Sequence, residues 1–390
     1  MKKITKQLSN LSVQQHCLML LCAAALFFAS CNKPRAPKAL KDFAQVNLVA
    51  NNDEYSAAHI DPILLNAWGL AFSSGGTPWV NATDGHVSAV YDKEGATVRP
   101  PVNIPSPTAA TGGSPTGIVF SGSTTDFILP NAAPARFIFV GEDGVLSAWN
   151  GGAGANAFRI KNNTATSSYK GLAIATNAGA TYLYATDFKA GKIVVWDKNF
   201  APVAMEFKDN QIPWGYAPFN IQAVGSWLYV TYAKVGPAGD DEKGKGNGFV
   251  DIFKTDGSLA KRFAARGHLN SPWGVALAPS TFFVDTDDPA AAKNGNSGSN
   301  SGQGSGIAIK GSDDEDIVLI GNFGDGRINA FRENGDFLGQ LRSHGREIII
   351  DGLWSLSFPP TTSTIDPNRL YFTAGPDDEE DGLFGYLIKQ

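Results

Sequence analysis

Short apolar segments recur along the chain in groups of three, and no stretch of any length has the periodicity of an amphipathic helix. In the first group, residues 67–72 are followed by 78–81, the turn Asp84-Gly85 and 87–92. Five similar groups begin at residues 115, 169, 218, 272 and 351. Each group predicts three successive strands of one antiparallel sheet, so we expect an almost all-β chain.

A marker residue, Gly in five groups and Asn in one, lies near the start of each group, at positions 69, 117, 171, 220, 274 and 352. The intervals are 48, 54, 49, 54 and 78 residues, close to the roughly 40–50 residues of a four-stranded propeller blade. The last interval contains a Gly-, Ser- and Asn-rich stretch at about 285–314, and without these 30 residues it returns to 48. The pattern predicts a six-bladed β-propeller over residues 43–390, with an insertion loop in the fifth blade.

The sixth group supplies only three strands, whereas residues 43–50 precede the first group and alternate like a strand. We expect this N-terminal strand to complete the last blade, because an open ring would leave an exposed sheet edge.

Residues 1–30 have the pattern of an export signal. Three lysines precede an apolar run at 17–29, which is too short to span a bilayer. The sequence Phe28-Ala29-Ser30-Cys31 resembles the lipobox of bacterial lipoproteins, although Phe28 stands where Leu is most common. The resemblance implies a lipidated Cys31, and a plain secretory signal is the alternative.

The composition of the remaining chain agrees with a globular domain that is held at a membrane. Residues 31–42 are basic and contain proline, which predicts a tether between the lipid and the ring. All three cysteines lie at positions 17, 22 and 31, so the ring has no disulfide. Without residues 1–30 the chain has 29 basic and 37 acidic side chains, and nucleic acid is not an expected partner. We expect an exported, lipid-anchored monomer of the bacterial cell envelope.

Candidate binding residues lie in loops that a propeller places around one end of its channel. These are the loops that enter the innermost strands and the loops between second and third strands. The tryptophans at 68, 273 and 354 recur in the inner strands, where they either pack in the core or offer stacking surfaces to a carbohydrate or another planar ligand. The expected ligand-binding residues at this channel mouth are Asn66, Trp68, Lys170, Trp273 and Asp351.

Three further residues have the chemistry of a metal site. Asn81, Asp187 and Asn322 lie at the same place in alternate groups, and their side-chain oxygens suit Ca²⁺. The alternative is that they hydrogen-bond turn backbone, as Asn and Asp do in most turns. The chain has no paired-histidine zinc motif and no Gly-x-Ser-x-Gly motif, so no catalytic residue is identified.

Several motifs in order resemble a known group of proteins. They include Asn66-Ala67-Trp68-Gly69, Pro115-Thr116-Gly117, Tyr169-Lys170-Gly171, Pro218-Phe219-Asn220 and Gly321-Asn322-Phe323-Gly324. With them, residues 44–389 resemble an uncharacterised family of exported bacterial proteins. The resemblance implies a propeller of the NHL-repeat or gluconolactonase-like type, without an assigned activity.

Two functions therefore stay open. The first is a binding module for a small molecule, a glycan or an envelope protein. The alternative is a metal-dependent hydrolase of the lactonase or esterase type, with Asn81, Asp187 and Asn322 as ligands. The fold class cannot decide between them, because propellers serve both purposes.

Overall fold

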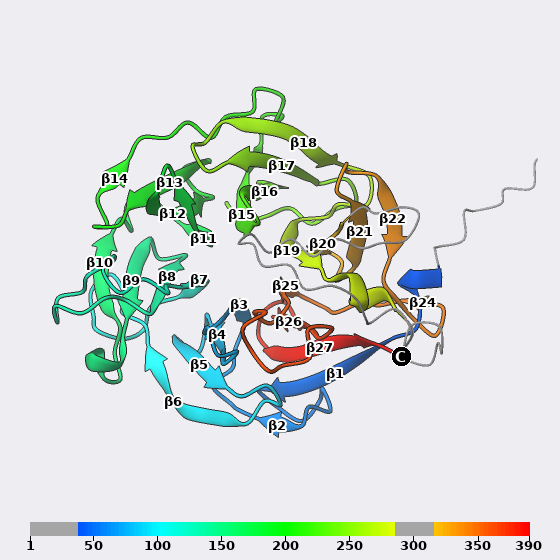
Figure 1. The fold of residues 1–390 in the computed structure, drawn as a ribbon, viewed down its shortest axis with the longest axis horizontal. Helices are drawn as coiled ribbons and strands as arrows, with labels where there is room; N and C mark the ends of the chain where they lie inside the picture. Colours follow the sequence, from blue (N-terminus) through cyan, green and yellow to red (C-terminus); the bar gives the residue numbers. More distant parts are fainter. Residues whose placement is uncertain (1–37, 285–315) are drawn as a thin grey trace, which may run out of the picture. The chain divides into compact units, whose positions relative to one another are not determined.

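Six antiparallel sheets surround a central axis in the computed structural model, which describes residues 38–284 and 316–390 (Figure 1). The predicted six-bladed β-propeller is confirmed. Within the described residues, helical structure is limited to three 3₁₀ turns, η1 (Lys38–Leu40), η2 (Gly151–Ala153) and η3 (Ser280–Phe283). The predicted signal at 1–30, most of the tether and the insertion at 285–314 lie outside the described residues.

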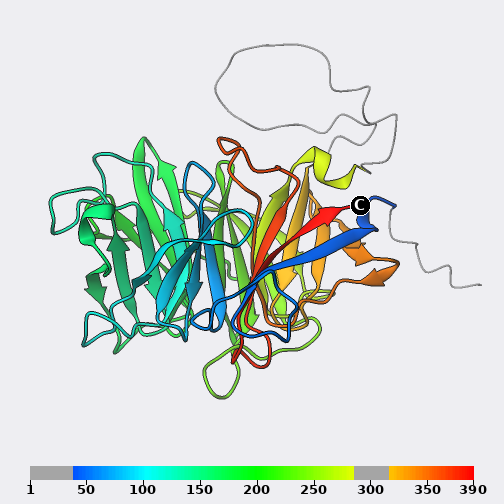
Figure 2. The same cartoon turned by 90° about the horizontal axis from the view of Figure 1, so that it is seen from below.

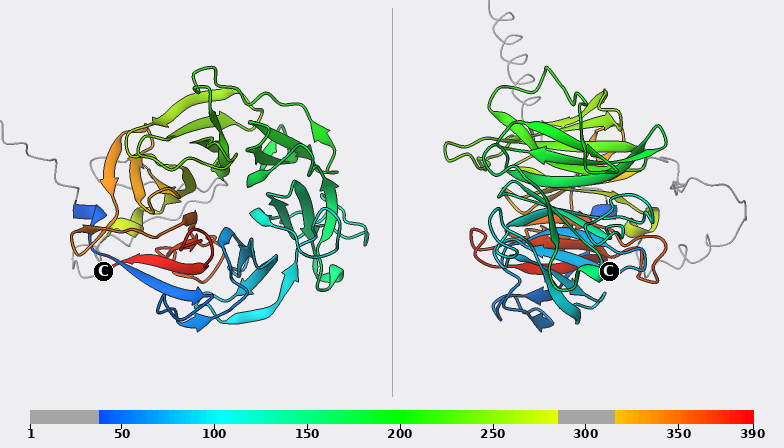
Figure 3. Two further views of the ribbon diagram at one scale, coloured as in Figure 1. Left: turned by 180° about the vertical axis from the view of Figure 1, so that it is seen from behind. Right: turned by 90° about the vertical axis from the view of Figure 1, so that its left-hand side faces the viewer.

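The first three blades each have four strands in sequence order. Figure 3 shows the ring of blades from behind. Blade 1 consists of β3 (Ala67–Phe72), β4 (Pro78–Ala82), β5 (Val87–Tyr91) and β6 (Thr97–Asn103). Blade 2 consists of β7 (Pro115–Phe120), β8 (Phe137–Gly141), β9 (Val145–Trp149) and β10 (Phe158–Asn162). Blade 3 consists of β11 (Tyr169–Asn177), β12 (Ala180–Asp187), β13 (Lys192–Asp197) and β14 (Pro202–Val203).

Blades 4 and 5 repeat this order, and a small hairpin follows them. Blade 4 consists of β15 (Tyr216–Val224), β16 (Trp227–Lys234), β17 (Gly248–Lys254) and β18 (Leu259–Ala265). Blade 5 consists of β19 (Pro272–Ala278), β20 (Ile317–Asn322), β21 (Ile328–Arg332) and β22 (Phe337–Gln340). The hairpin pairs β23 (Arg342–Ser343) with β24 (Arg346–Glu347).

The sixth blade is closed by the N-terminal strand. It contains β25 (Leu353–Ser357), β26 (Leu370–Ala374), β27 (Leu383–Lys389), β1 (Phe43–Ala50) and β2 (His59–Ile60). Strand β1 is antiparallel to β27, with Phe43 opposite Lys389 and Ala50 opposite Leu383. Figure 1 shows these two strands side by side. The predicted closure is confirmed.

The sequence groups identified the three inner strands of each blade but not the outermost ones. The inner strands are buried on both faces, whereas outer strands such as β6 and β14 are largely exposed. An outer strand contacts a neighbour on one side only, so its sequence keeps little hydrophobic pattern.

The core lies between adjacent blades. Trp79 of blade 1 stacks on Phe137 of blade 2 with ring centroids 3.9 Å apart. Tyr169 of blade 3 packs edge-on against Trp196 of the same blade, in a cluster that also contains Ile138 of blade 2. Because each core is shared by two blades, no single blade buries its own apolar faces.

Each innermost strand has a register shift near its start, which places the marker residues against the next blade. A Cβ atom on Gly69 would lie 2.1 Å from the carbonyl oxygen of Thr116, and one on Gly171 would lie 2.2 Å from Asn220 Oδ1. Glycine is therefore required because the backbone of one blade meets the bulge of the next.

One marker was misplaced by three positions. In blade 6, Ser355 follows Trp354 within the register shift, as Gly69 follows Trp68 in blade 1. The predicted marker Gly352 instead precedes β25, with φ +62°. The repeat pattern did not identify Ser355 because the residue at this position is neither glycine nor asparagine. Where other blades have a close backbone contact, the Ser355 hydroxyl donates a hydrogen bond of 2.7 Å to the Trp68 carbonyl.

The role of the marker glycines can be tested with a Gly69→Ala variant. We expect it to lower the free energy of unfolding by about 1–3 kcal/mol, because the added methyl group meets rigid backbone. The matched control is Gly151→Ala, since a Cβ there would meet nothing within 4 Å, and its effect should stay within about 0.5 kcal/mol. Urea denaturation measures both, and an unchanged midpoint for Gly69→Ala would refute the packing argument.

Candidate functional site

Six residues, one in each bulge, lie where the innermost strands begin. They are Trp68, Thr116, Lys170, Phe219, Trp273 and Trp354. The four aromatic side chains pack in one cluster and Lys170 lies near Trp68, whereas Thr116 Oγ1 donates to backbone carbonyls. A bulge turns side chains away from the regular alternation of a strand. We call this end of the channel the mouth.

The bulges are locked by hydrogen bonds from one blade to the next. Asn81 Nδ2 donates to the Thr116 carbonyl at 2.8 Å, and Asn220 Nδ2 donates to the Trp273 carbonyl at 2.7 Å. Similar bonds run from Thr116 Oγ1 to the carbonyl of Tyr169 and from Thr186 Oγ1 to that of Phe219. The mouth is therefore a rigid frame, because its backbone carbonyls are held by buried side chains.

The floor of the mouth is a column of three stacked aromatic rings. Trp354 lies between Trp68, at a centroid distance of 3.6 Å, and Phe323, at 3.8 Å, and both pairs are within 12° of parallel. Trp273 packs edge-on against Trp68 and Trp354. These rings come from blades 1, 5 and 6 and form one apolar cluster with Phe219.

A lysine ammonium lies near each end of the column. Lys170 Nζ is 5.1 Å from the centroid of Trp68, and Lys243 Nζ is 4.6 Å from that of Phe323. Both distances are within the range of cation–π attraction. The side chain of Lys170 is only 5% exposed, whereas that of Lys243 is 44% exposed.

Carboxylates form a rim around the two ammonium groups. Lys170 is paired with Glu142, and its distance to Asp240 is 3.4 Å. Lys243 lies 3.7 Å from Asp378, whose side chain is almost fully exposed. Lys243 lies in the β16–β17 loop and Asp378 in the β26–β27 loop. Figure 2 shows that these two loops project from the same face of the ring.

The electrostatic environment keeps Lys170 charged. Burial alone would lower the pKa of Lys170, but the carboxylates of Glu142, Asp240 and Glu379 more than offset burial and raise it. A lysine that stays protonated is a cation and a donor, not a nucleophile. Lys170 therefore supplies a buried positive charge and hydrogen-bond donor at the mouth.

Two carboxyl groups of the mouth have pKa values above their usual range. Burial, together with the nearby charge of Glu142, raises the pKa of Glu379 to about 7. Burial also raises the pKa of Asp241. Both shifts arise mainly because burial disfavours the charged carboxylate, so these two groups hold their protons to a higher pH than exposed carboxyl groups do.

An unusual turn brings Glu379 to the mouth. Asp377, Asp378 and Glu379 have φ values of +54°, +51° and +75°, a left-handed conformation that is unfavourable for residues with a side chain. The Asp377 amide donates to Asp351 Oδ2, and Glu379 Oε2 accepts from Asn66 Nδ2 at 2.9 Å. The turn therefore folds the acidic run back over the inner strands.

The predicted ligand-binding residues lie at the mouth, where Asn66, Trp68, Lys170 and Trp273 are buried and Asp351 is exposed. Lys170 and Trp68 are in contact, and Trp273 packs edge-on against Trp68. Asn66 links Trp354 to Glu379, because its Oδ1 accepts from the indole nitrogen at 2.9 Å. Asp351 is exposed and supports the left-handed turn.

The predicted metal ligands are not brought together. Asn81 Nδ2 donates to the Thr116 carbonyl of the next blade. Asp187 Oδ1 accepts from the amides of Ser168 and Ala190, and Asn322 Oδ1 accepts from the amide of Asn270. Asn81 and Asp187 each keep one buried oxygen without a partner. Asp187 and Asn322 end second strands and Asn81 is next to the end of one, so all three lie one strand away from the innermost strands.

Their present partners match the alternative that Asn and Asp hydrogen-bond backbone. In the described part of the chain, no three His, Cys, Asp or Glu side chains are grouped in a way that could hold a metal.

Sequence reasoning missed Phe323, Lys243 and Glu379. A signal for the aromatic residue was present, because Phe188 and Phe323 each follow the last residue of a second strand. Phe188 also lies at the mouth, 5.9 Å from Lys170 Nζ. The acidic run at 377–381 had no such signal, because an exposed, solvated turn has the same composition.

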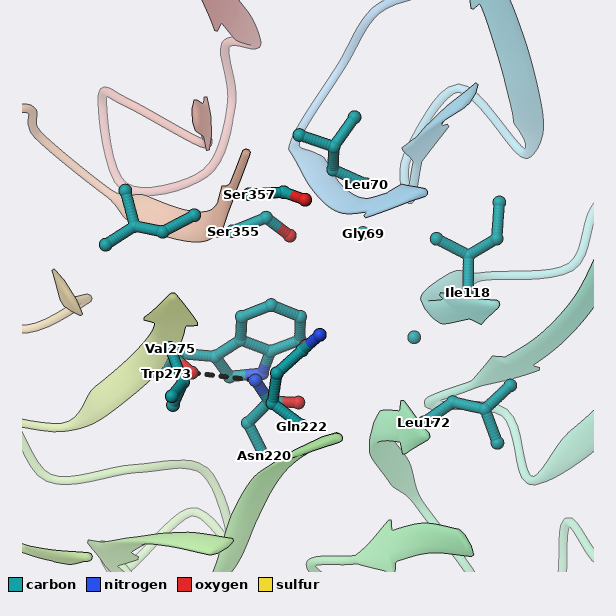
Figure 4. A pocket seen from close by; sticks show the side chains of 12 residues that line it. Gly69, Leu70, Ile118, Leu172, Asn220, Gln222, Trp273, Val275, Ser355 and Ser357 are labelled. Carbon is teal, nitrogen blue, oxygen red and sulfur yellow. Dashed lines mark hydrogen bonds between the residues drawn. The ribbon is translucent and has the colours of Figure 1, made fainter. Parts of the chain in front are cut away.

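Behind the mouth, side chains of the innermost strands surround a small cavity in the channel (Figure 4). Leu70, Ile118, Leu172 and Val275 line it, and the indole of Trp273 lies at its end. The remaining cavity has a volume of about 20 Å³, which is room for about one water molecule. A cavity of about 240 Å³ adjoins it farther along the innermost strands, and Gln222, Val275 and Leu356 line both.

No protein-family model matches the chain. Two proteins of Acanthamoeba polyphaga mimivirus are similar in sequence. The uncharacterized protein R648 is 31% identical over 371 residues, which cover 91% of this chain and 83% of R648. The uncharacterized protein L690 is 31% identical over 372 residues, which cover 91% of this chain and 88% of L690. Because both are viral proteins, they do not support the bacterial origin that the sequence resemblance implied.

Solved structures are similar in fold. A structural genomics protein of unknown function from Bacteroides thetaiotaomicron has a TM-score of 0.51 at 9% identity, over 89% of this chain and 76% of that protein. A gluconolactonase from Xanthomonas campestris has a TM-score of 0.43 at 14% identity, over 83% of this chain and 88% of that enzyme. Identities this low say nothing about activity.

Searching residues 38–284 and 316–390 for a helix with the length and apolar character of a membrane span yields none. The predicted lipid anchor, Cys31, lies outside the described residues.

Proposed function

The chain belongs to the family of the uncharacterized mimivirus proteins R648 and L690, and from this premise we propose that it is a ligand-binding β-propeller whose site is the mouth. The group it recognises is an organic cation, an ammonium or a guanidinium, on a small molecule or on a partner protein. The observation that carries the proposal is the aromatic column with an ammonium near each end and acidic groups around it.

The charge balance of the mouth favours a cation. Five carboxyl groups surround two ammonium groups, and they are Glu142, Asp240, Asp241, Asp378 and Glu379. An added cation relieves the repulsion among these acids, whereas an anion would increase it. Aromatic faces add about 0.5–2 kcal/mol to the binding of such a cation.

Lys243 marks the place that the ligand cation takes. Its side chain is half-exposed, and its partner Asp378 is held only at the surface. Displacing Lys243 therefore costs little, because exposed ion pairs are worth about 1 kcal/mol or less. Lys170 stays in place, because it is buried and paired with Glu142.

The proposal includes an exported protein that is held at a membrane through a lipidated Cys31. The support for this part is the lipobox-like Phe28-Ala29-Ser30-Cys31 and the basic, proline-containing segment that follows it.

A test uses isothermal titration with spermidine, a flexible organic trication. We expect saturable binding that weakens as salt rises and that Asp240→Asn weakens about tenfold, because it removes one rim charge. The matched control, Asp366→Asn, should bind as the wild type does, because this exposed acid lies in the β25–β26 loop, which projects from the opposite face (Figure 2).

Two results would contradict the proposal. One is an absence of saturable spermidine binding in the wild type at low salt. The other is stoichiometric Ca²⁺ binding that Asp187→Ala abolishes, which would favour the metal-dependent hydrolase instead.

A further inference from the structure

A second cavity lies beside the mouth, between blades 3 and 4. Its volume is about 930 Å³, within the range of small-ligand sites, which is about 300–1,000 Å³. Aromatic side chains from both blades and their connection line it, and they are Phe188, Phe207, Trp214, Tyr216 and Tyr232. We call it the groove.

Trp214 is the most unusual residue of the groove because its side chain is 100% exposed. Single exposed apolar residues are ordinary, but a bare indole at the edge of a large aromatic cavity is not accounted for by packing. This indole contributes no burial to the fold and is free to stack on a ligand.

The loop that carries Trp214 is held firmly. Asp209, on the same loop, is paired with Arg262 of blade 4, and it also accepts from the amide of Gln211 at 2.7 Å. The carbonyl of Gly215 accepts from the amide of Val235 at 2.7 Å. A ligand would therefore meet a largely preformed surface, which lowers the entropy cost of binding.

The charged side chains of the groove are of both signs and are engaged in pairs or hydrogen bonds at several positions. Lys234 is paired with Glu242 at 2.6 Å, and Asp209 is paired with Arg262. Lys189 Nζ donates to the carbonyl of Ala165 at 3.2 Å. Lys208 also lines the groove, so it has hydrogen-bond donors and acceptors of both signs and lacks the acidic excess of the mouth.

We propose that the groove binds a neutral oligosaccharide, with one sugar ring stacked on the indole of Trp214. The apolar C–H face of a sugar fits an exposed aromatic ring, and its hydroxyl groups fit paired charged side chains that can both donate and accept. This site is independent of the cation site of the mouth, so either one can fail without the other.

The test follows the intrinsic fluorescence of the full chain during titration with three neutral hexasaccharides, namely cellohexaose, maltohexaose and N-acetylchitohexaose. We expect at least one to shift the emission to the blue in a saturable way, because a stacked sugar removes water from Trp214. Trp214→Ala should weaken binding at least about tenfold by calorimetry, and Trp214→Phe should restore part of the affinity.

The matched control is Trp227→Ala. Trp227 is also exposed and belongs to blade 4, but it begins β16 at the end opposite to Lys234. Its loss should leave the affinity unchanged. The proposal is overturned if none of the three sugars binds or if Trp214→Ala binds as the wild type does.

Discussion

A chain that begins at Asn51, and so lacks β1, is expected to lose its cooperative fold altogether. Strand β1 is the fourth strand of the sixth blade and pairs along its whole length with β27. It buries Phe43, Leu48 and Val49 almost completely. At about 1.5–3 kcal/mol for each large apolar side chain, this loss is comparable with the whole stability of a typical domain, about 5–15 kcal/mol.

The effect should extend beyond one blade. Phe43 packs against Phe282 of the β19–β20 connection, with ring centroids 4.9 Å apart. Strand β1 also anchors the segment that follows it, in which Asn51 and Tyr55 both donate to Asp381 of the β26–β27 loop. Removing β1 therefore opens the ring and weakens the fifth blade as well as the sixth.

Hydrogen exchange and urea denaturation distinguish the outcomes. The control is a chain that begins at Lys38, which retains β1 and should unfold in one cooperative transition. If the shorter chain still protects the amides of blades 1 to 4 and loses protection only in blade 6, the ring does not depend on closure and this expectation is wrong.

Replacing Glu379 with Gln is expected to stabilise the protein at neutral and alkaline pH. In the folded chain, burial raises the pKa of Glu379 from 4.5 to about 7, so the folded state binds this proton more tightly than the unfolded state does. Stability then falls as pH rises from about 4.5 to 7, because the buried group must ionise. A difference of this size corresponds to about 3 kcal/mol above pH 7.

The variant should therefore have a higher melting temperature than the wild type at pH 8 and an equal one near pH 4. Gln can still accept the hydrogen bond from Asn66 Nδ2. The matched control is Glu380→Gln, an exposed neighbour in the same turn, which should change the melting temperature little at either pH. A variant that is less stable than the wild type at pH 8 would show that charged Glu379 supports the mouth.

The two proposed sites lie on one face but differ in chemistry. The mouth has an excess of carboxylates over an aromatic floor, whereas the groove has paired charges and an exposed indole. Phe188 lines the groove and also approaches Lys170 of the mouth. A ligand with a cationic group and a sugar could contact both, and the separate variants of Asp240 and Trp214 would reveal this.

The sequence by itself determined the repeat. Segments such as 67–72 and 115–120 are short, apolar and regularly spaced, and such segments pair as antiparallel strands wherever a turn follows. Strand β1 was predictable for the same reason, because its alternation matches a blade that lacks a fourth strand. Five of the six marker positions were also evident from spacing.

Only the tertiary structure decided how the loops meet. Asn66 and Glu379 are 313 positions apart, and their contact depends on a left-handed turn that residue propensities do not favour. Asn81 has the chemistry of a metal ligand, but the next blade brings a carbonyl to its amide nitrogen. Local pattern specifies strands because it acts through neighbouring residues, whereas side-chain partners at a channel mouth depend on ring closure, which brings distant segments together.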